Sequence, residues 1–460
     1  MILEDDRSSA ANAGTRRLGW LLFLSLWLAY GVAINSSNLE AFALQQAGVE
    51  AYVERGHLYV EGSSVERLKV RPGGDTFSYG DHIYPGKQPG QFMVGALAYA
   101  SLVALGLSYP GNYLLTAALV TLLTGSLVTA AAAVAVFHAV RVLAGDGAGL
   151  FWPLLAALSY GLGSTAFAYS GIAWHDSLAA GFLSVALCLI FSLRRMQVKW
   201  RSVASFAAGA MLGLTLTTSM LPAPMVGVVA VFVLTMKDWR LIAFFGTGIA
   251  VGLASLLIYD FLCFGHPLLL PNVAGGYEDI WFNPSWNNFV DKVFFYARMI
   301  TLYTPIVWVG LLGLALFPRR LRHLQVLLAF MLAAHATYVL NIEATGTCQW
   351  GPRYMLPAMP LVCIGFAGFT RLGWSWMGRT AALAAAGCTL SSGFFNFIGA
   401  AHGAMLCDFP GWAVGTYLAA TVRGEGRVYP LAAWLALPMF ASAVLLVREA
   451  VILARVRTVT

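Results

Sequence analysis

The segment 74–90 carries the densest group of side chains that could do chemistry. Asp75, Asp81, His82 and Lys87 fall within it, among glycines and prolines that permit tight bends. A carboxylate or an imidazole can take a proton from a hydroxyl group, and a lysine ammonium can bind phosphate. The segment could therefore hold a general base beside a phosphate-binding cation. The alternative is an ordinary solvated loop, because exposed acids and imidazoles are common.

Two shorter segments add to this chemistry. His175 and Asp176 stand where one apolar run ends and the next begins. We expect Asp176 to cap the following helix, with substrate contact as its alternative, and His175 to lie at the same mouth. Arg353 and Tyr354 stand at the start of a later apolar run. The guanidinium presents a planar fork that suits phosphate, whereas its alternative role is to anchor a helix at the lipid interface.

The composition places these segments in a membrane protein. Of 460 residues, 59% are hydrophobic and 11% are charged, and the mean hydropathy is +0.72. Soluble domains carry about a quarter of charged residues. Long apolar runs without alternation predict transmembrane helices rather than barrel strands. We therefore expect an all-α fold in which residues 1–460 form one polytopic membrane domain. Nucleic acid is not an expected partner, because the net charge of +7 comes from short basic clusters at helix ends.

Hydropathy predicts about twelve transmembrane helices and one shorter apolar segment. The predicted spans are 18–34, 113–137, 149–171, 177–193, 203–219, 222–236, 240–262, 298–317, 322–342, 354–370, 380–400 and 431–447. If the shorter segment 92–107 crossed the membrane, the basic clusters at 194–201 and 319–322 would lie outside, against the positive-inside rule. We therefore expect 92–107 to be a juxtamembrane half-helix. Both termini are then cytoplasmic, in a bacterial inner membrane.

This topology puts the larger loops on the extracytoplasmic side. They are residues 35–112, which include the juxtamembrane helix, and residues 263–297 and 401–430. The mouths at His175 and Arg353 open on the same side. The sequence therefore predicts one outward-facing hollow where the first loop meets these two mouths.

The layout resembles that of the GT-C type membrane glycosyltransferases, which include the protein O-mannosyltransferases and the aminoarabinose transferase. An N-terminal span precedes a long outer loop, a Pro/Gly motif with a lysine and a half-inserted helix. Four pieces are also similar to uncharacterised bacterial relatives, namely residues 75–90, 168–175, 263–267 and 351–360. The resemblance implies an inverting transferase that moves a sugar from a polyprenyl-phosphate donor to an extracytoplasmic glycan, lipid or protein acceptor.

The resemblance also assigns residues. Lys87 matches the lysine of the motif, and Arg353 is a partner for the donor phosphate. Better-known members carry an Asp-Glu pair after the first span, where this chain has Ser37-Asn38-Leu39-Glu40. Asp75 matches an acid of the uncharacterised group and is the first candidate for the catalytic base, with Glu40 second. No cofactor is assigned and a divalent metal is left open. Further candidate substrate contacts are Asp81, His82, His175 and Tyr354.

Two other functions stay open. A transporter or flippase for a lipid-linked saccharide would need polar residues inside the spans and, often, two related halves. The predicted spans are nearly free of charge and the sequence has no convincing internal repeat, so transport is less favoured. A non-catalytic scaffold of envelope assembly is the other alternative, because the Asp-Glu pair is missing.

Overall fold

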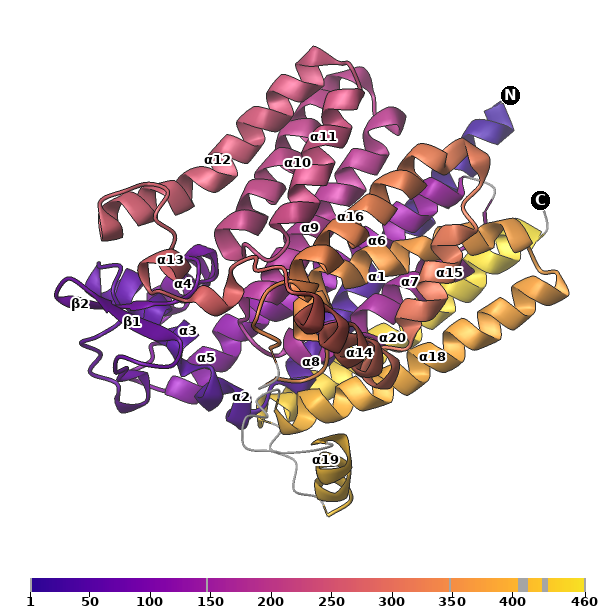
Figure 1. The fold of residues 1–460 in the computed structure, drawn as a ribbon. Helices are drawn as coiled ribbons and strands as arrows, with labels where there is room; N and C mark the ends of the chain where they lie inside the picture. Colours follow the sequence, from indigo (N-terminus) through magenta and orange to yellow (C-terminus); the bar gives the residue numbers. More distant parts are fainter. Residues whose placement is uncertain (1, 146–147, 347–348, 404–412, 424–428, 459–460) are drawn as a thin grey trace.

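The structure is a computed structural model that describes residues 2–145, 148–346, 349–403, 413–423 and 429–458 (Figure 1). Within these ranges the chain is almost wholly helical, with one two-stranded antiparallel sheet of β1 (Thr76–Tyr79) and β2 (His82–Pro85). The helices in chain order are α1 (Ile2–Ala33), α2 (Ser36–Ala41), α3 (Ala43–Glu50), α4 (Gly90–Ala104), α5 (Tyr113–Thr121), α6 (Leu127–Ala144), α7 (Phe151–Gly161), α8 (Thr165–Ser170), α9 (His175–Ser192), α10 (Val198–Thr218), α11 (Ala223–Thr235), α12 (Trp239–Phe264), α13 (Pro271–Ala274), α14 (Trp286–Tyr303), α15 (Ile306–Ala315), α16 (Arg322–Leu340), α17 (Met359–Ile364), α18 (Trp376–His402), α19 (Ala413–Val422) and α20 (Leu431–Thr458).

Many of these helices have the length and composition of membrane spans. Seven described helical segments are long and apolar enough to cross a bilayer, and an eighth is counted if the bent pair α14 and α15 forms one span. The chain is therefore a polytopic α-helical membrane protein, as the sequence predicts. Every predicted span has a helical counterpart, but the count of about twelve crossings stays a prediction.

Two predicted spans are not continuous helices. Residues 149–171 divide into α7 and α8, because Ser164 leaves the helical conformation and its hydroxyl accepts the Ala166 N–H at 3.2 Å. Residues 298–317 divide into α14 and α15, which meet at an angle of 103°. Pro305 follows Thr304 there, and a residue before proline disfavours the helical conformation. Hydropathy averages over such breaks.

The apolar segment expected at 92–107 forms α4, which begins at Gly90 and has 15 residues. A span across about 30 Å of hydrocarbon needs roughly 20 residues, so α4 is short for a crossing. Its Phe92 packs directly on Gly48 of α3, where an added Cβ would lie 2.4 Å from the ring. The first loop therefore holds α4 against the bundle.

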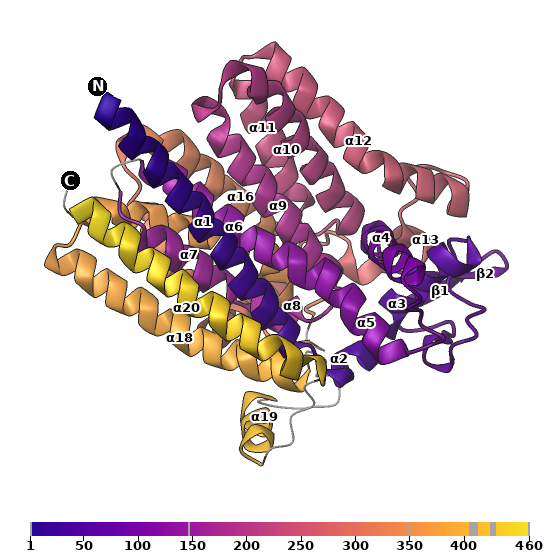
Figure 2. The ribbon, with the colours of Figure 1, turned by 180° about the vertical axis from the view of Figure 1, so that it is seen from behind.

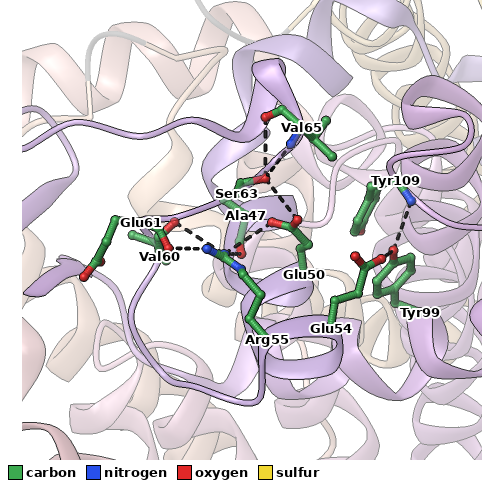
Figure 3. Close-up of polar contacts among 10 residues, drawn as sticks. All are labelled: Ala47, Glu50, Glu54, Arg55, Val60, Glu61, Ser63, Val65, Tyr99 and Tyr109. Atoms are coloured by element: carbon green, nitrogen blue, oxygen red, sulfur yellow. Dashed lines mark hydrogen bonds and ion pairs between the residues drawn. The ribbon is translucent and has the colours of Figure 1, made fainter.

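A buried polar network ties the first loop to α4 (Figure 3). Arg55 pairs with the buried Glu50 at 3.3 Å, and the Ser63 hydroxyl donates to the same carboxylate at 3.0 Å. On the neighbouring side, the Tyr99 hydroxyl of α4 donates to the carboxylate of Glu54. Burial raises the pKa of Glu50, although Ser63 and Arg55 act against that rise. These contacts fix the loop relative to α4.

The two chain ends lie at one end of the molecule, and the hairpin, α3, α4 and α13 lie at the other (Figures 1 and 2). Helices α1 and α20 pack side by side, and Arg17 faces Glu449 at 3.6 Å. Basic residues gather at the end with the termini. There, Arg320 donates to the Ala144 carbonyl at 3.3 Å and Arg371 to the Leu316 carbonyl at 3.4 Å.

Small residues let α10 and α12 approach closely. A Cβ added to Gly209 would lie 2.1 Å from the Phe245 carbonyl oxygen, and one added to Gly248 would lie equally close to the Phe206 carbonyl oxygen. Helices in a bilayer associate through such close backbone packing, because lipid tails are as apolar as leucine side chains. Helices α10 and α12 therefore pack tightly against each other in the bundle.

Candidate functional site

The base of the β-hairpin brings Asp75 and Lys87 together. The strands pair Thr76 with Pro85, so the residues on either side of the pair face each other. The Gly86 N–H donates to the Asp75 carbonyl at 2.7 Å, and the Lys87 ammonium lies 2.9 Å from Asp75 Oδ1. The Asp75 side chain is half-exposed, whereas that of Lys87 is mostly buried. The first loop thus presents a joined carboxylate and ammonium.

Neighbouring charges keep Asp75 ionised. Burial opposes the charged form, but the charge and hydrogen bond of Lys87 outweigh it and hold the pKa of Asp75 below its usual value. The charge of Arg353, and that of His175 when it is protonated, act on Asp75 in the same direction. Residues that are far apart in the sequence therefore share one electrostatic environment, and the carboxylate is in the form that can accept a proton.

The turn between α8 and α9 supplies Trp174 and His175. The Trp174 ring is buried and meets Phe42 edge to face, with ring centroids 4.8 Å apart. His175 opens α9 and is buried, and its Nδ1 atom has no hydrogen-bond partner among the described residues. A buried ring nitrogen without a partner is available to a polar group of a substrate.

Asp176 does not cap α9, so that expectation is wrong. The N-cap is Trp174, and no side chain there accepts a helix N–H. The carboxylate instead turns inward, where it accepts the Trp174 indole N–H at 3.2 Å and the Ser219 hydroxyl at 3.0 Å. Its side chain is almost fully buried. Asp176 therefore holds the Trp174 ring and the end of α10 in place behind the site.

Arg353 begins a short 3₁₀ segment, Arg353–Ala358, that leads into α17. Its guanidinium is buried and lies over two rings, 5.4 Å from the Trp174 centroid and 4.6 Å from the Tyr354 centroid. Its Nε atom has no hydrogen-bond partner within the part of the chain that the structure describes. The Tyr354 carbonyl is held by the His335 imidazole of α16 at 2.8 Å. A fixed guanidinium with an unused donor suits an anionic ligand.

A cavity of about 240 Å³ opens beside Asp75. Its lining comes from α2 and α3, the first loop, the mouth of α9 and the segment before Arg353, and includes Phe42, Gln45, Arg71, Asp75, Trp174 and Gln349. The Gln349 side chain is buried, and its Oε1 atom has no hydrogen-bond partner among the described residues. Gln349 and Trp174 were not among the predicted site residues, because neither belongs to a charged motif.

A second hollow, of about 390 Å³ and mostly apolar, opens next to Lys87. Gln88 lines it and donates to Asn272 of α13 at 2.8 Å. The other walls come from the turn before α11, from α16 and from Trp281 and Phe282. Asp75 lines the polar cavity and Gln88 lines the apolar groove, and Lys87, which precedes Gln88, pairs with Asp75.

Three predicted site residues lie elsewhere. The Glu40 carboxylate pairs with Arg67 at 3.5 Å and does not line the cavity, although it is half-exposed. Asp81 stands in the exposed hairpin turn, and His82 contacts Glu61 at 2.8 Å and stacks on Tyr59 with centroids 3.8 Å apart. Four-residue strands hold this turn roughly 13 Å from the base of the hairpin. Neighbours in the sequence are therefore separated by the pairing of the strands.

The described residues contain no group of three or more His, Cys, Asp or Glu side chains that could hold a metal ion. Asp408, a residue of the predicted loop 401–430, lies outside the described residues. The candidate site therefore contains the half-exposed carboxylate of Asp75 and the buried carboxylate of Asp176. Its other members are Lys87, Arg353 and the imidazole of His175.

Comparison with solved structures defines the class of the fold. The chain has a GT-C-like fold, as the sequence resemblance predicts. It is similar to ArnT from Cupriavidus metallidurans, whose crystal structure is bound to undecaprenyl phosphate, with a TM-score of 0.51 and 16% sequence identity over 95% of this chain and 78% of that one. No protein-family model matches the sequence, and no curated protein matches it significantly.

Proposed function

We propose that the protein is a membrane glycosyltransferase that moves a sugar from a polyprenyl-phosphate donor to a hydroxyl group of an extracytoplasmic acceptor. The observation that carries the proposal is the ion pair of Asp75 with Lys87, whose electrostatic environment Asp75 shares with His175 and Arg353. An ionised carboxylate beside two cations matches what the reaction needs, which is a proton acceptor and a charge-stabilised phosphate leaving group. The GT-C-like fold supports the same class of reaction.

The donor would lie between the two hollows. Lys87 and Arg353 would hold the phosphate, and the apolar groove beside Gln88 would take the first part of the polyprenyl chain. His175 Nδ1, which has no hydrogen-bond partner among the described residues, and the Tyr354 ring beside Arg353 would contact the sugar or the phosphate. The polar cavity on the other side of Asp75 would then receive the acceptor.

The chemical step follows from this arrangement. The acceptor oxygen attacks the anomeric carbon, and the bond from that carbon to the phosphate oxygen breaks. The electron pair of that bond leaves with the polyprenyl phosphate, whose charge Lys87 and Arg353 neutralise. The proton of the acceptor hydroxyl passes to Asp75. Attack from the side opposite the leaving group inverts the anomeric configuration.

The proposal also includes the side of the membrane on which the candidate site opens. The candidate site lies at the end of the molecule opposite the termini and the basic clusters at Arg320 and Arg371. Basic residues mark the cytoplasmic side of a bilayer. The site would therefore open outside the cytoplasm of a bacterial inner membrane, where polyprenyl-linked sugars are accessible from the outer leaflet.

Reconstitution tests the proposal. The purified protein in liposomes with a labelled polyprenyl-phosphate sugar should transfer the label to a hydroxyl acceptor or to water. Asp75→Asn should lower kcat by about 100-fold or more, because a general base typically contributes 10²–10⁴. Arg353→Ala should lower kcat/KM by a similar factor. Glu40→Gln is the matched control and should retain activity within about threefold, since its carboxylate lies outside the cavity. Equal activity of all three variants would remove the catalytic assignment.

A flippase is the second candidate, and one observation favours it. Asp260 of α12 is fully buried, and neither carboxylate oxygen has a hydrogen-bond partner among the described residues. Ionisable residues inside spans often mark transport pathways. If the protein is a transferase, Asp260→Asn should leave sugar transfer within about threefold of the unmodified protein. Loss of lipid-linked sugar translocation in this variant, with no transfer by the unmodified protein, would establish the flippase instead.

A further inference from the structure

The end of the bundle opposite the candidate site contains a hollow that the proposed function does not use. It has a volume of about 210 Å³ and lies between the ends of α9, α10, α11, α12 and α16. Phe191, Phe232 and Leu324 form apolar walls from three of these helices. Arg194, Arg201 and His323 line the same hollow. An apolar floor beneath two arginine side chains suits an amphiphilic anion rather than a hydrated ion.

Two of the charged side chains at this hollow, Arg201 and Asp238, already make hydrogen bonds within the protein. The Arg201 guanidinium donates to the Met196 carbonyl at 3.2 Å and to the Arg194 carbonyl at 3.4 Å, which closes the turn after α9. Asp238, which lines the same hollow, accepts the Leu241 N–H at 3.3 Å and caps α12. Its negative charge is thereby offset by the positive end of a helix dipole.

No such hydrogen bond holds the side chains of Arg194 and His323 within the part of the chain that the structure describes. Among the described residues the Arg194 guanidinium has no hydrogen bond or ion pair, although it lines the hollow. The His323 ring lies parallel to Phe232, with centroids 6.5 Å apart, and both line the hollow. The hollow therefore holds an arginine whose charge is not matched by a protein anion.

The surroundings place this hollow at the level of lipid headgroups. Trp200 near the start of α10 is 56% exposed, and Trp239 at the start of α12 is 79% exposed. Exposed tryptophans at helix ends are typical of the membrane interface. Lys199 lies over the Trp200 ring at 5.9 Å and adds to the positive potential.

We propose that this hollow binds the headgroup of an anionic phospholipid. The phosphate would contact Arg194 and His323, and the glycerol and first acyl carbons would cover the apolar walls. A lipid fits better than a soluble phosphate because the walls are apolar and the hollow stands at the bilayer surface. This site is independent of the proposed transferase reaction.

Native mass spectrometry of the detergent-purified chain tests the site. Phosphatidylglycerol should be retained in preference to phosphatidylcholine with the same acyl chains. Arg194→Gln should weaken phosphatidylglycerol retention about fivefold, since one basic residue at the surface contributes about 1 kcal/mol, and His323→Gln should weaken it in the same direction. Arg379→Gln is the matched control, because Arg379 is an exposed arginine of α18 that does not line the hollow. Equal retention by Arg194→Gln and Arg379→Gln would overturn the proposal.

Two further measurements complete the test. Thermal unfolding without added lipid should be the same for Arg194→Gln and the unmodified chain, which shows that the variant is folded. Inorganic phosphate at the concentration of the lipid headgroups should not displace phosphatidylglycerol. Displacement by phosphate alone would assign the hollow to a soluble anion and would refute the lipid site.

Discussion

At the scale of single residues, the ion pair of Asp75 and Lys87 has two consequences. Without donor, the ammonium neutralises the carboxylate across 2.9 Å. A donor phosphate would compete for the same ammonium and would free Asp75 to accept a proton. The base would thus become more basic when the donor is in place, because the charge that lowers its pKa would be shared with phosphate.

Lys87→Met tests this coupling. Removal of the ammonium removes the charge and hydrogen bond that lower the pKa of Asp75, so that pKa should rise. At a given acidic pH less of the carboxylate is then ionised, and the acid limb of kcat/KM should move to higher pH. The KM for the donor should also rise by about 10-fold or more, because a hydrogen bond to a charged group contributes about 1.5–3 kcal/mol.

The matched control is Lys69→Met, which removes an exposed lysine of the same loop. Lys69 pairs with Glu66 rather than with Asp75. Its pH profile should coincide with that of the unmodified protein. An unchanged acid limb in Lys87→Met as well would separate Asp75 from the proton transfer.

Some residues of the candidate site could be predicted from their type and their place in the sequence, whereas others could not. Lys87, Arg353 and His175 were expected around one outward-facing hollow with Asp75. Lys87 pairs with Asp75, and His175 and Arg353 influence its charge. Gln349 and the inward turn of Asp176 were not expected. An amide and a buried acid show their partners only after packing, because either residue type is equally common on a solvated surface.

At the scale of elements, the first loop works as a folded unit. The π-helical turn Ala51–Arg55 lets Arg55 reach back to Glu50 and to the carbonyls of Ala47 and Val60. The same turn presents Glu54 to Tyr99 of α4. The position of the hairpin, and with it that of Asp75, therefore depends on a network that contacts α4 (Figure 3).

Arg55→Met should loosen this unit. The Glu50 carboxylate would remain buried with Ser63 as its hydrogen-bond donor, and breaking a buried ion pair typically costs about 3–5 kcal/mol. Hydrogen exchange of residues 36–68 and 90–104 should accelerate, and transferase activity should fall with it. In the control Arg67→Met, which removes a half-exposed ion pair with Glu40, the free energy of unfolding should change by less than about 1 kcal/mol. Equal exchange in both variants would contradict the role of the network.

At the scale of the whole molecule, sidedness is the property that function needs. Asp81 stands in the turn between β1 and β2, Arg379 lies in the first turn of α18, and both side chains are exposed. The hairpin and the start of α18 lie at opposite ends of the molecule (Figure 1). In cells, Asp81→Cys should react with a membrane-impermeant thiol reagent added outside, because the hairpin is extracytoplasmic in our proposal. Arg379→Cys should react only after permeabilisation. The unmodified chain provides the background from native cysteines, and the reverse pattern would place the site in the cytoplasm.

The sequence by itself determined the helical class, the membrane setting and the short helix at α4, because these depend on the solvation of local segments. Apolar runs must be helical in hydrocarbon, whatever their neighbours are. The GT-C-like fold was likewise expected from the order of local motifs, and the comparison of structures confirms it.

Only the tertiary structure decided which of the candidates meet. Residues 75, 175 and 353 come from distant segments and share one electrostatic environment, whereas Glu40 pairs with Arg67, Asp81 lies in the hairpin turn and His82 contacts Glu61. Hydropathy cannot predict which polar residues contact each other. The free energy of a polar contact depends on its partners and its burial, which no local sequence window contains.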